Sequence, residues 1–136
     1  MNNLFLSLRP WQWIKNLLIF VPYLLTNKSF DYIMVELFFA FLLFSLFVSS
    51  TYLLNDIKDR EIDMLHPKKS DRPIASGALT VRNAKLSAFL IMTLVTIISF
   101  FVNQNLIIFI FIYGCITYSY TNYTKYIYLL DTLSIC

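Results

Sequence analysis

Three aspartates follow a long apolar segment at a spacing that could do chemistry. Asp56, Asp59 and Asp63 are three and four residues apart, so a helix through this stretch carries them on one face. Like charges at these spacings repel one another, and the negative end of the helix dipole adds to the repulsion. Both effects favour a compensating cation. Carboxylates suit Mg²⁺, which commonly binds one or two of them together with substrate phosphates, so we predict a magnesium site.

The same spacing also fits a solvated helix at the membrane surface. The other charged residues of this stretch, Lys58, Arg60 and Glu61, are predicted to point away from the aspartates. Mixed charges of this kind need no metal when water hydrates each side chain. Spacing alone leaves both interpretations open.

A basic segment, HPKKSDRPIASG at residues 66–77, follows the aspartates. Pro67 and Pro73 interrupt any helix here, which predicts a loop. Lys68 and Arg72 lie close in sequence to the acidic stripe, and both can bind phosphate oxygens. Acidic side chains for a metal beside basic side chains for phosphate suit a diphosphate substrate. Attraction of the basic residues to anionic lipid head groups is the alternative.

The composition places these residues in a membrane protein. Of 136 residues, 58% are hydrophobic and 14% are charged, against about 25% charged in soluble domains. Two glycines exclude a glycine-rich nucleotide loop, and two cysteines without metal-like spacing indicate neither a disulfide framework nor a zinc site. The predicted fold class is all-α, a polytopic bundle of transmembrane helices. Its predicted spans cover residues 11–26, 32–54, 84–102 and 106–121, and a fifth apolar segment begins at residue 126.

Charge predicts how the bundle is oriented. Seven of the eleven Lys and Arg residues fall between Lys58 and Lys85, and the positive-inside rule places the 55–83 loop in the cytoplasm together with the N-terminus. The predicted location is the cell (plasma) membrane, in a multi-pass arrangement. Lys15 and Asn16 lie inside the first span, where polar residues commonly face a substrate path. Lys15 can instead extend to the membrane surface.

The motifs together resemble those of the UbiA superfamily of intramembrane prenyltransferases. Asn55 and the three aspartates match its first aspartate-rich motif, N-D-x-x-D-x-x-x-D, and RPIASG at 72–77 matches the stretch that follows. RPWQWIKN at 9–16 and HPKK at 66–69 are similar to the narrower branch that contains decaprenyl-phosphate phosphoribosyltransferase. Residues 118–119 and 129–131 are also similar to that branch, so the resemblance covers nearly all of the chain.

This resemblance implies a nine-span helical bundle whose cavity opens to the cytoplasm and to lipid. In the phosphoribosyl branch, 5-phosphoribosyl diphosphate is the donor, a polyprenyl phosphate is the acceptor and pyrophosphate leaves. Mg²⁺ is the implied cofactor. The family implies metal-binding and catalytic roles for Asp56, Asp59 and Asp63, assistance from Asn55, donor phosphate contacts from Lys68 and Arg72, and a cavity lining nearby from Lys15 and Asn16.

The chain also departs from the family pattern. Members are longer and carry a second acidic motif, which these residues lack. We therefore expect residues 1–136 to be the N-terminal part of one transferase domain, truncated, with no second domain and inactive alone. Two alternatives stay open: transfer of a prenyl group from a prenyl diphosphate to an aromatic acceptor, and a small non-catalytic membrane protein. HPKK favours phosphoribosyl transfer, and no nucleic-acid partner is expected.

Overall fold

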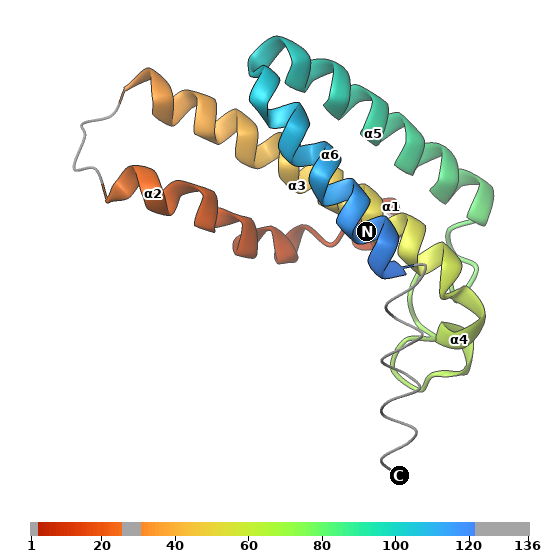
Figure 1. Ribbon diagram of the computed structural model, residues 1–136. Coiled ribbons are helices and arrows are strands. Elements are labelled where there is room, and N and C mark those ends of the chain that lie inside the picture. The colour runs from red at the N-terminus through yellow and green to blue at the C-terminus, as the bar shows by residue number, and fades with distance from the viewer. Residues whose placement is uncertain (1–2, 26–30, 122–136) are drawn as a thin grey trace.

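The computed structural model describes residues 3–25 and 31–121. Every regular element in these two ranges is helical, which confirms the all-α prediction. The chain runs, in order, through α1 (Asn3–Leu8), the 3₁₀ helix η1 (Pro10–Phe20), α2 (Val21–Leu24), α3 (Tyr32–Lys58), α4 (Arg60–Leu65), α5 (Val81–Val102) and α6 (Gln104–Ser119). Figure 1 shows α5 and α6 folded back on one another beside α3. The apolar segment that begins at residue 126 lies outside the described residues.

Among the described helices, α3 and α5 are long and apolar enough to cross a membrane. They have 27 and 22 residues, where a bilayer needs about 20. Asp31 begins α3 by accepting hydrogen bonds from two backbone N–H groups of the first turn, and Thr80 begins α5 by accepting one. The spans predicted at 32–54 and 84–102 are confirmed as helices, although α3 continues to Lys58 and α5 already begins at Val81.

The first predicted span, residues 11–26, is not a single α-helix. It consists of η1 and the short α2, in which Pro22 is the second residue. Proline lacks the backbone N–H that a continuous α-helix would use at this position. A 3₁₀ helix rises about 2.0 Å per residue, so the 11 residues of η1 extend about 22 Å. The narrower winding lets this short segment reach further along the bundle than an α-helix of equal length.

The fourth predicted span corresponds to α6, an apolar helix of 16 residues. Asn103 lies alone between α5 and α6, and its side chain accepts a hydrogen bond from the N–H of Asn105. Residues 103–105 are the polar stretch between the spans predicted at 84–102 and 106–121. Only the first of them is outside a helix, because Asn103 both ends one helix and caps the next.

Helix α3 is the centre of the bundle and contacts α1, η1, α4, α5 and α6. Its contact with α5 is the most extensive. Ala84 and Ala88 are one helical turn apart on α5 and fully buried, so their small side chains let the two backbones approach closely. Further along, a larger apolar cluster joins α3, α5 and α6 and consists of Leu43, Phe47, Val95, Leu106 and Ile110.

Replacing Ala88 by leucine is expected to destabilise the bundle, because Ala88 has no exposed surface and no room for a larger side chain. Overpacking of this kind costs about 1 to 3 kcal/mol. Thr93→Leu is the matched control, since Thr93 is exposed on the same helix. Thermal unfolding in detergent measures both variants. Equal melting temperatures for the two would contradict close packing between α3 and α5.

Candidate functional site

The loop between α4 and α5 is docked into the bundle by one apolar side chain. Ile74 is buried in a cluster with residues of α3 and α5. Two residues before it, the backbone carbonyl of Arg72 accepts hydrogen bonds from the backbone N–H and the hydroxyl of Ser76. Gly77 then takes a φ of 79°, which glycine adopts without strain. The RPIASG segment is thus a folded turn that places Arg72 beside the end of α3.

The helix predicted through the three aspartates is interrupted at the middle one. Asp59 lies between α3 and α4 with φ −85° and ψ 0°. Backbone hydrogen bonds continue across the junction, from Asp59 to Asn55 and from Asp63 to Asp59. The three carboxylates therefore remain on one buried side, with exposed fractions of 4% for Asp56, 9% for Asp59 and 2% for Asp63.

Two arginines supply positive charge to these buried aspartates. Nη2 of Arg9 donates to both carboxylate oxygens of Asp56, at 2.6 and 2.7 Å. Nη1 of Arg72 donates to Oδ1 of Asp56 at 3.1 Å and to Oδ2 of Asp63 at 2.6 Å. Nζ of Lys69 lies 3.9 Å from the other oxygen of Asp63. The compensating cation is therefore supplied, in this conformation, by side chains of the protein.

Arg9, the first residue of the RPWQWIKN segment, belongs to this site, although no binding or catalytic role was predicted for it. It has a left-handed backbone, with φ 52° and ψ 53°, and it is the one non-glycine residue with positive φ in the described parts of the chain. Such a conformation costs on the order of 1 to 3 kcal/mol and is found preferentially at functional sites. The guanidinium also lies 5.3 Å from the ring centre of Tyr52. A charged residue directly before an apolar span was the available sequence signal.

The predicted magnesium site lies where these ion pairs are found. Within the described residues, no group of three or more His, Cys, Asp or Glu side chains is placed to hold a metal ion. The guanidinium of Arg72 lies between two of the aspartates instead. The donor set itself fits Mg²⁺, because the ligands are carboxylates and oxygens of Asp56 and Asp63 converge on a single cationic atom.

A cavity of about 400 Å³ opens beside the ion pairs. Its lining includes Arg9, Asp56, Lys68 and Arg72, together with Gln12 of η1. Lys68 is exposed on the docked loop, so its ammonium group can reach a ligand in the cavity. Lys68 and Arg72, the two residues predicted to bind phosphate, are thus brought to one cavity with the first aspartate. Three cationic side chains against two carboxylates, Asp56 and Asp71, leave the lining with an excess of positive charge, which suits an anionic ligand.

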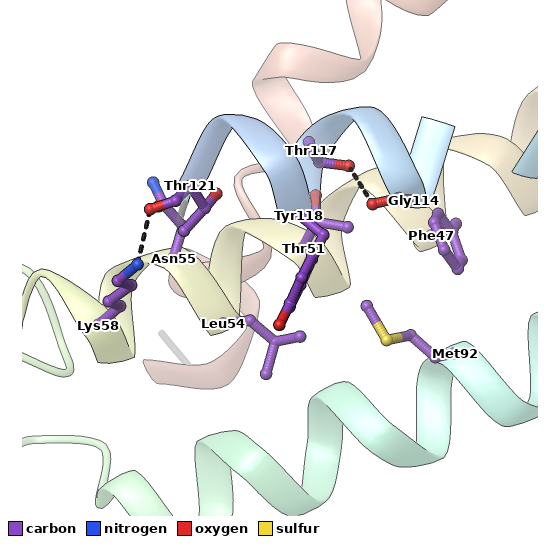
Figure 2. A pocket seen from close by; sticks show the side chains of 10 residues that line it. All are labelled: Phe47, Thr51, Leu54, Asn55, Lys58, Met92, Gly114, Thr117, Tyr118 and Thr121. Carbon is purple, nitrogen blue, oxygen red and sulfur yellow. Dashed lines mark hydrogen bonds between the residues drawn. The ribbon is translucent and has the colours of Figure 1, made fainter. Parts of the chain in front are cut away.

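Asn55 faces a different cavity, of about 440 Å³, between α3, α5 and α6 (Figure 2). Apolar side chains such as Phe47, Leu54 and Met92 form much of its wall. Lys58 lies at one end, where its Nζ donates to the carbonyl oxygen of Thr121 at 2.7 Å. Oδ1 of Asn55 is buried and accepts no hydrogen bond from the described residues. The lining thus combines an apolar wall with the polar side chains of Asn55 and Lys58, which suits a ligand with both an apolar and a polar part.

Lys15 and Asn16 are not brought together with the aspartates. They line a third cavity, of about 350 Å³, whose other walls are apolar. Asn16 donates from Nδ2 to Oγ of Ser45 on α3 at 2.9 Å, and Trp13 donates in the same way to Ser49. Positions three apart share a face of a 3₁₀ helix, as positions four apart do in an α-helix. Asn16 therefore joins η1 to α3, and Lys15 is exposed.

The fold and the site together define a helical membrane protein. Charged side chains line its 400 Å³ cavity, which is suited to phosphorylated ligands. The model of the UbiA prenyltransferase family matches residues 17–136, and the chain belongs to that family.

Three relatives are 34% to 43% identical to this chain over the residues that they share with it. Decaprenyl-phosphate phosphoribosyltransferase of Mycolicibacterium smegmatis is 36% identical over 135 residues, which cover 96% of this chain and 42% of that enzyme. The uncharacterized protein y4nM of Sinorhizobium fredii is 34% identical over 126 residues, or 92% of this chain and 24% of that protein. Nodulation protein NoeC of Azorhizobium caulinodans is 43% identical over 72 residues, or 53% of this chain and 24% of that protein. The chain thus spans less than half the length of these relatives.

Proposed function

We propose that the protein is a Mg²⁺-dependent membrane transferase that moves a phosphoribosyl group from 5-phosphoribosyl diphosphate to a polyprenyl phosphate. The observation that carries the proposal is the cavity that Arg9, Lys68 and Arg72 line together with the buried Asp56. In this reaction the bond between ribose and diphosphate breaks, a phosphate oxygen of the acceptor bonds to the same ribose carbon, and pyrophosphate leaves. Similarity to a decaprenyl-phosphate phosphoribosyltransferase over nearly the whole chain supports this choice of substrates.

The donor is proposed to bind in the 400 Å³ cavity. Lys68 and Arg72 would contact its phosphates, since charge-assisted hydrogen bonds to phosphate are strong. Asp56, Asp59 and Asp63 would hold Mg²⁺, which, when bound, neutralises charge on the departing diphosphate. Because these carboxylates are buried, water screens their interaction with a nearby cation only weakly.

The acceptor is proposed to bind in the 440 Å³ cavity on the α5 and α6 side of α3. Its apolar wall suits an isoprenoid chain, while Asn55 and Lys58 offer polar contacts to the phosphate end. Asn55 and Asp56 are neighbours on α3 but line different cavities. Consecutive positions on a helix are about 100° apart, so the two cavities adjoin different faces of α3, which supports approach of the two substrates from different directions. We place the protein in the cell membrane, with the N-terminus and the 55–83 loop in the cytoplasm, because most basic residues lie there.

The test is a transfer assay on membranes that contain the protein expressed from its complete gene. Labelled 5-phosphoribosyl diphosphate is expected to label polyprenyl phosphate, and EDTA is expected to stop the reaction. Lys68→Ala should raise the donor KM about tenfold while changing kcat less, since it removes one phosphate contact. Lys85→Ala, at an exposed position on α5, is the control.

Two results would reject the assignment. Transfer from a prenyl diphosphate to an aromatic acceptor, with no use of the phosphoribosyl donor, would establish the prenyltransferase alternative. If neither donor supports transfer, the result would favour the third interpretation, a membrane protein without transferase activity.

A further inference from the structure

Oxygens of two aspartates converge on a single nitrogen atom of Arg72. This atom, Nη1, lies 3.1 Å from Oδ1 of Asp56 and 2.6 Å from Oδ2 of Asp63. A positive centre shared by two carboxylates is the arrangement that a divalent cation would also use. Because two cations cannot share one position, a metal bound to these two oxygens must displace the guanidinium.

The two arginines at the site are held differently. Arg9 makes the shorter contacts with Asp56, and its side chain is 17% exposed, against 28% for that of Arg72. The left-handed backbone of Arg9 is followed by the rigid ring of Pro10, and its guanidinium also contacts the ring of Tyr52. Several independent contacts therefore fix Arg9.

Arg72 has an alternative position available. Its backbone is anchored by the turn to Ser76 and by the buried Ile74, so the chain itself need not move. Its side chain lines the 400 Å³ cavity, as those of Arg9 and Lys68 do, but it is more exposed than that of Arg9 and has no aromatic contact in the described residues. Rotation of the side chain alone can therefore take the guanidinium from the carboxylates to an anion in that cavity.

We propose that Arg72 occupies the place of a divalent cation between Asp56 and Asp63 and leaves it when the metal binds, whereas Arg9 keeps its contact with Asp56. This inference rests on the metal-dependent function proposed above. It assigns Arg9 as a positioning residue, the permanent counter-charge of Asp56. It assigns Arg72 two successive partners. They are the carboxylates before the metal binds and the donor phosphates after the metal has bound.

The first test measures arginine accessibility in the wild-type protein in detergent. Phenylglyoxal modifies accessible arginines, and mass spectrometry gives the rate at each residue. Saturating Mn²⁺, a probe that shares the preference of Mg²⁺ for oxygen ligands, is expected to raise the rate at Arg72 several-fold and to leave the rate at Arg9 unchanged. Sodium chloride of equal ionic strength is the control. An unchanged rate at Arg72, or an equal rise at both arginines, overturns the proposal.

The second test measures Mn²⁺ affinity from the electron paramagnetic resonance signal of the free ion. Arg72→Gln removes the competing guanidinium and is expected to tighten Mn²⁺ binding about tenfold. The reason is that the two carboxylates are then free of the arginine in most molecules, not only in a small fraction. Lys68→Gln removes the same charge from the same cavity without freeing a carboxylate, and it should leave the affinity nearly unchanged. Equal affinities in the two variants, or no Mn²⁺ binding in any variant, overturn the proposal.

These measurements separate the inference from the proposed function. If the protein transfers phosphoribose but Mn²⁺ does not change the modification rate of Arg72, the proposed function holds and the displacement of Arg72 by the metal is rejected. If Mn²⁺ does displace Arg72 but the protein does not use 5-phosphoribosyl diphosphate, the displacement holds and that function is rejected.

Discussion

Arg9→Ala is expected to cost about 3 to 5 kcal/mol of folding free energy, the largest stability effect of any single change at this site. The reason is the environment of Asp56, whose side chain is 5% exposed and receives both of its shortest hydrogen bonds from Arg9. Removing the guanidinium leaves a buried carboxylate with one longer contact to Arg72. Unfolding in detergent, followed by helical circular dichroism, measures the loss.

Two further variants separate the causes of that loss. Arg82→Ala removes an arginine that is exposed on α5, and it should change stability by no more than about 0.5 kcal/mol. Arg9→Gly removes the guanidinium but adopts the positive φ without strain, so it should be less destabilising than Arg9→Ala. An Arg9→Ala protein as stable as the Arg82→Ala protein would contradict the importance of the buried ion pair.

Asp59→Asn is expected to lower transfer activity by on the order of 100-fold, the size typical for loss of a group that stabilises charge at a reacting centre. Asparagine has nearly the same shape and can still hydrogen-bond at the junction of α3 and α4. The substitution therefore tests the negative charge of a residue that is 9% exposed. Transfer of labelled phosphoribose at saturating Mg²⁺ measures the effect.

Glu61→Gln provides the comparison, since Glu61 is exposed on α4 only two residues away. Its activity should match that of the wild type. Asp59→Asn should also keep a wild-type melting temperature. Full activity in Asp59→Asn would remove this residue from the proposed metal-binding group, and a large fall in melting temperature would assign it a structural role.

Much of the fold could be predicted because membrane helices are specified by local composition. The apolar runs that became α3 and α5 are bounded by Asp31 and Thr80, which cap helices through contacts within one turn. The 3₁₀ form of η1 was not predicted. It depends on Trp13 and Asn16 meeting Ser49 and Ser45 of α3, and such contacts between distant segments leave no local pattern.

The site was predictable to the extent that it is contiguous. Asp56, Asp63 and Arg72 belong to one stretch of the sequence, so their proximity was expected, whereas the direct ion pairs between them were not. Arg9 comes from 47 residues earlier, so no periodicity connects it to Asp56. Asn55 was grouped with the aspartates because it is the first residue of the family motif that contains them. One step along a helix turns a side chain by about 100°, which takes Asn55 into another cavity.

The buried position of Ile74 has a consequence for how the protein is made. Its cluster combines Leu53 near the end of α3 with Ala84 and Ala88 near the start of α5. During synthesis the loop therefore cannot dock until both of these helices have entered the membrane and met. Until then Arg72 has no fixed place, and the aspartates remain hydrated. Docking of this loop, and with it the ion pairs of Arg72, therefore depends on prior packing of α3 against α5.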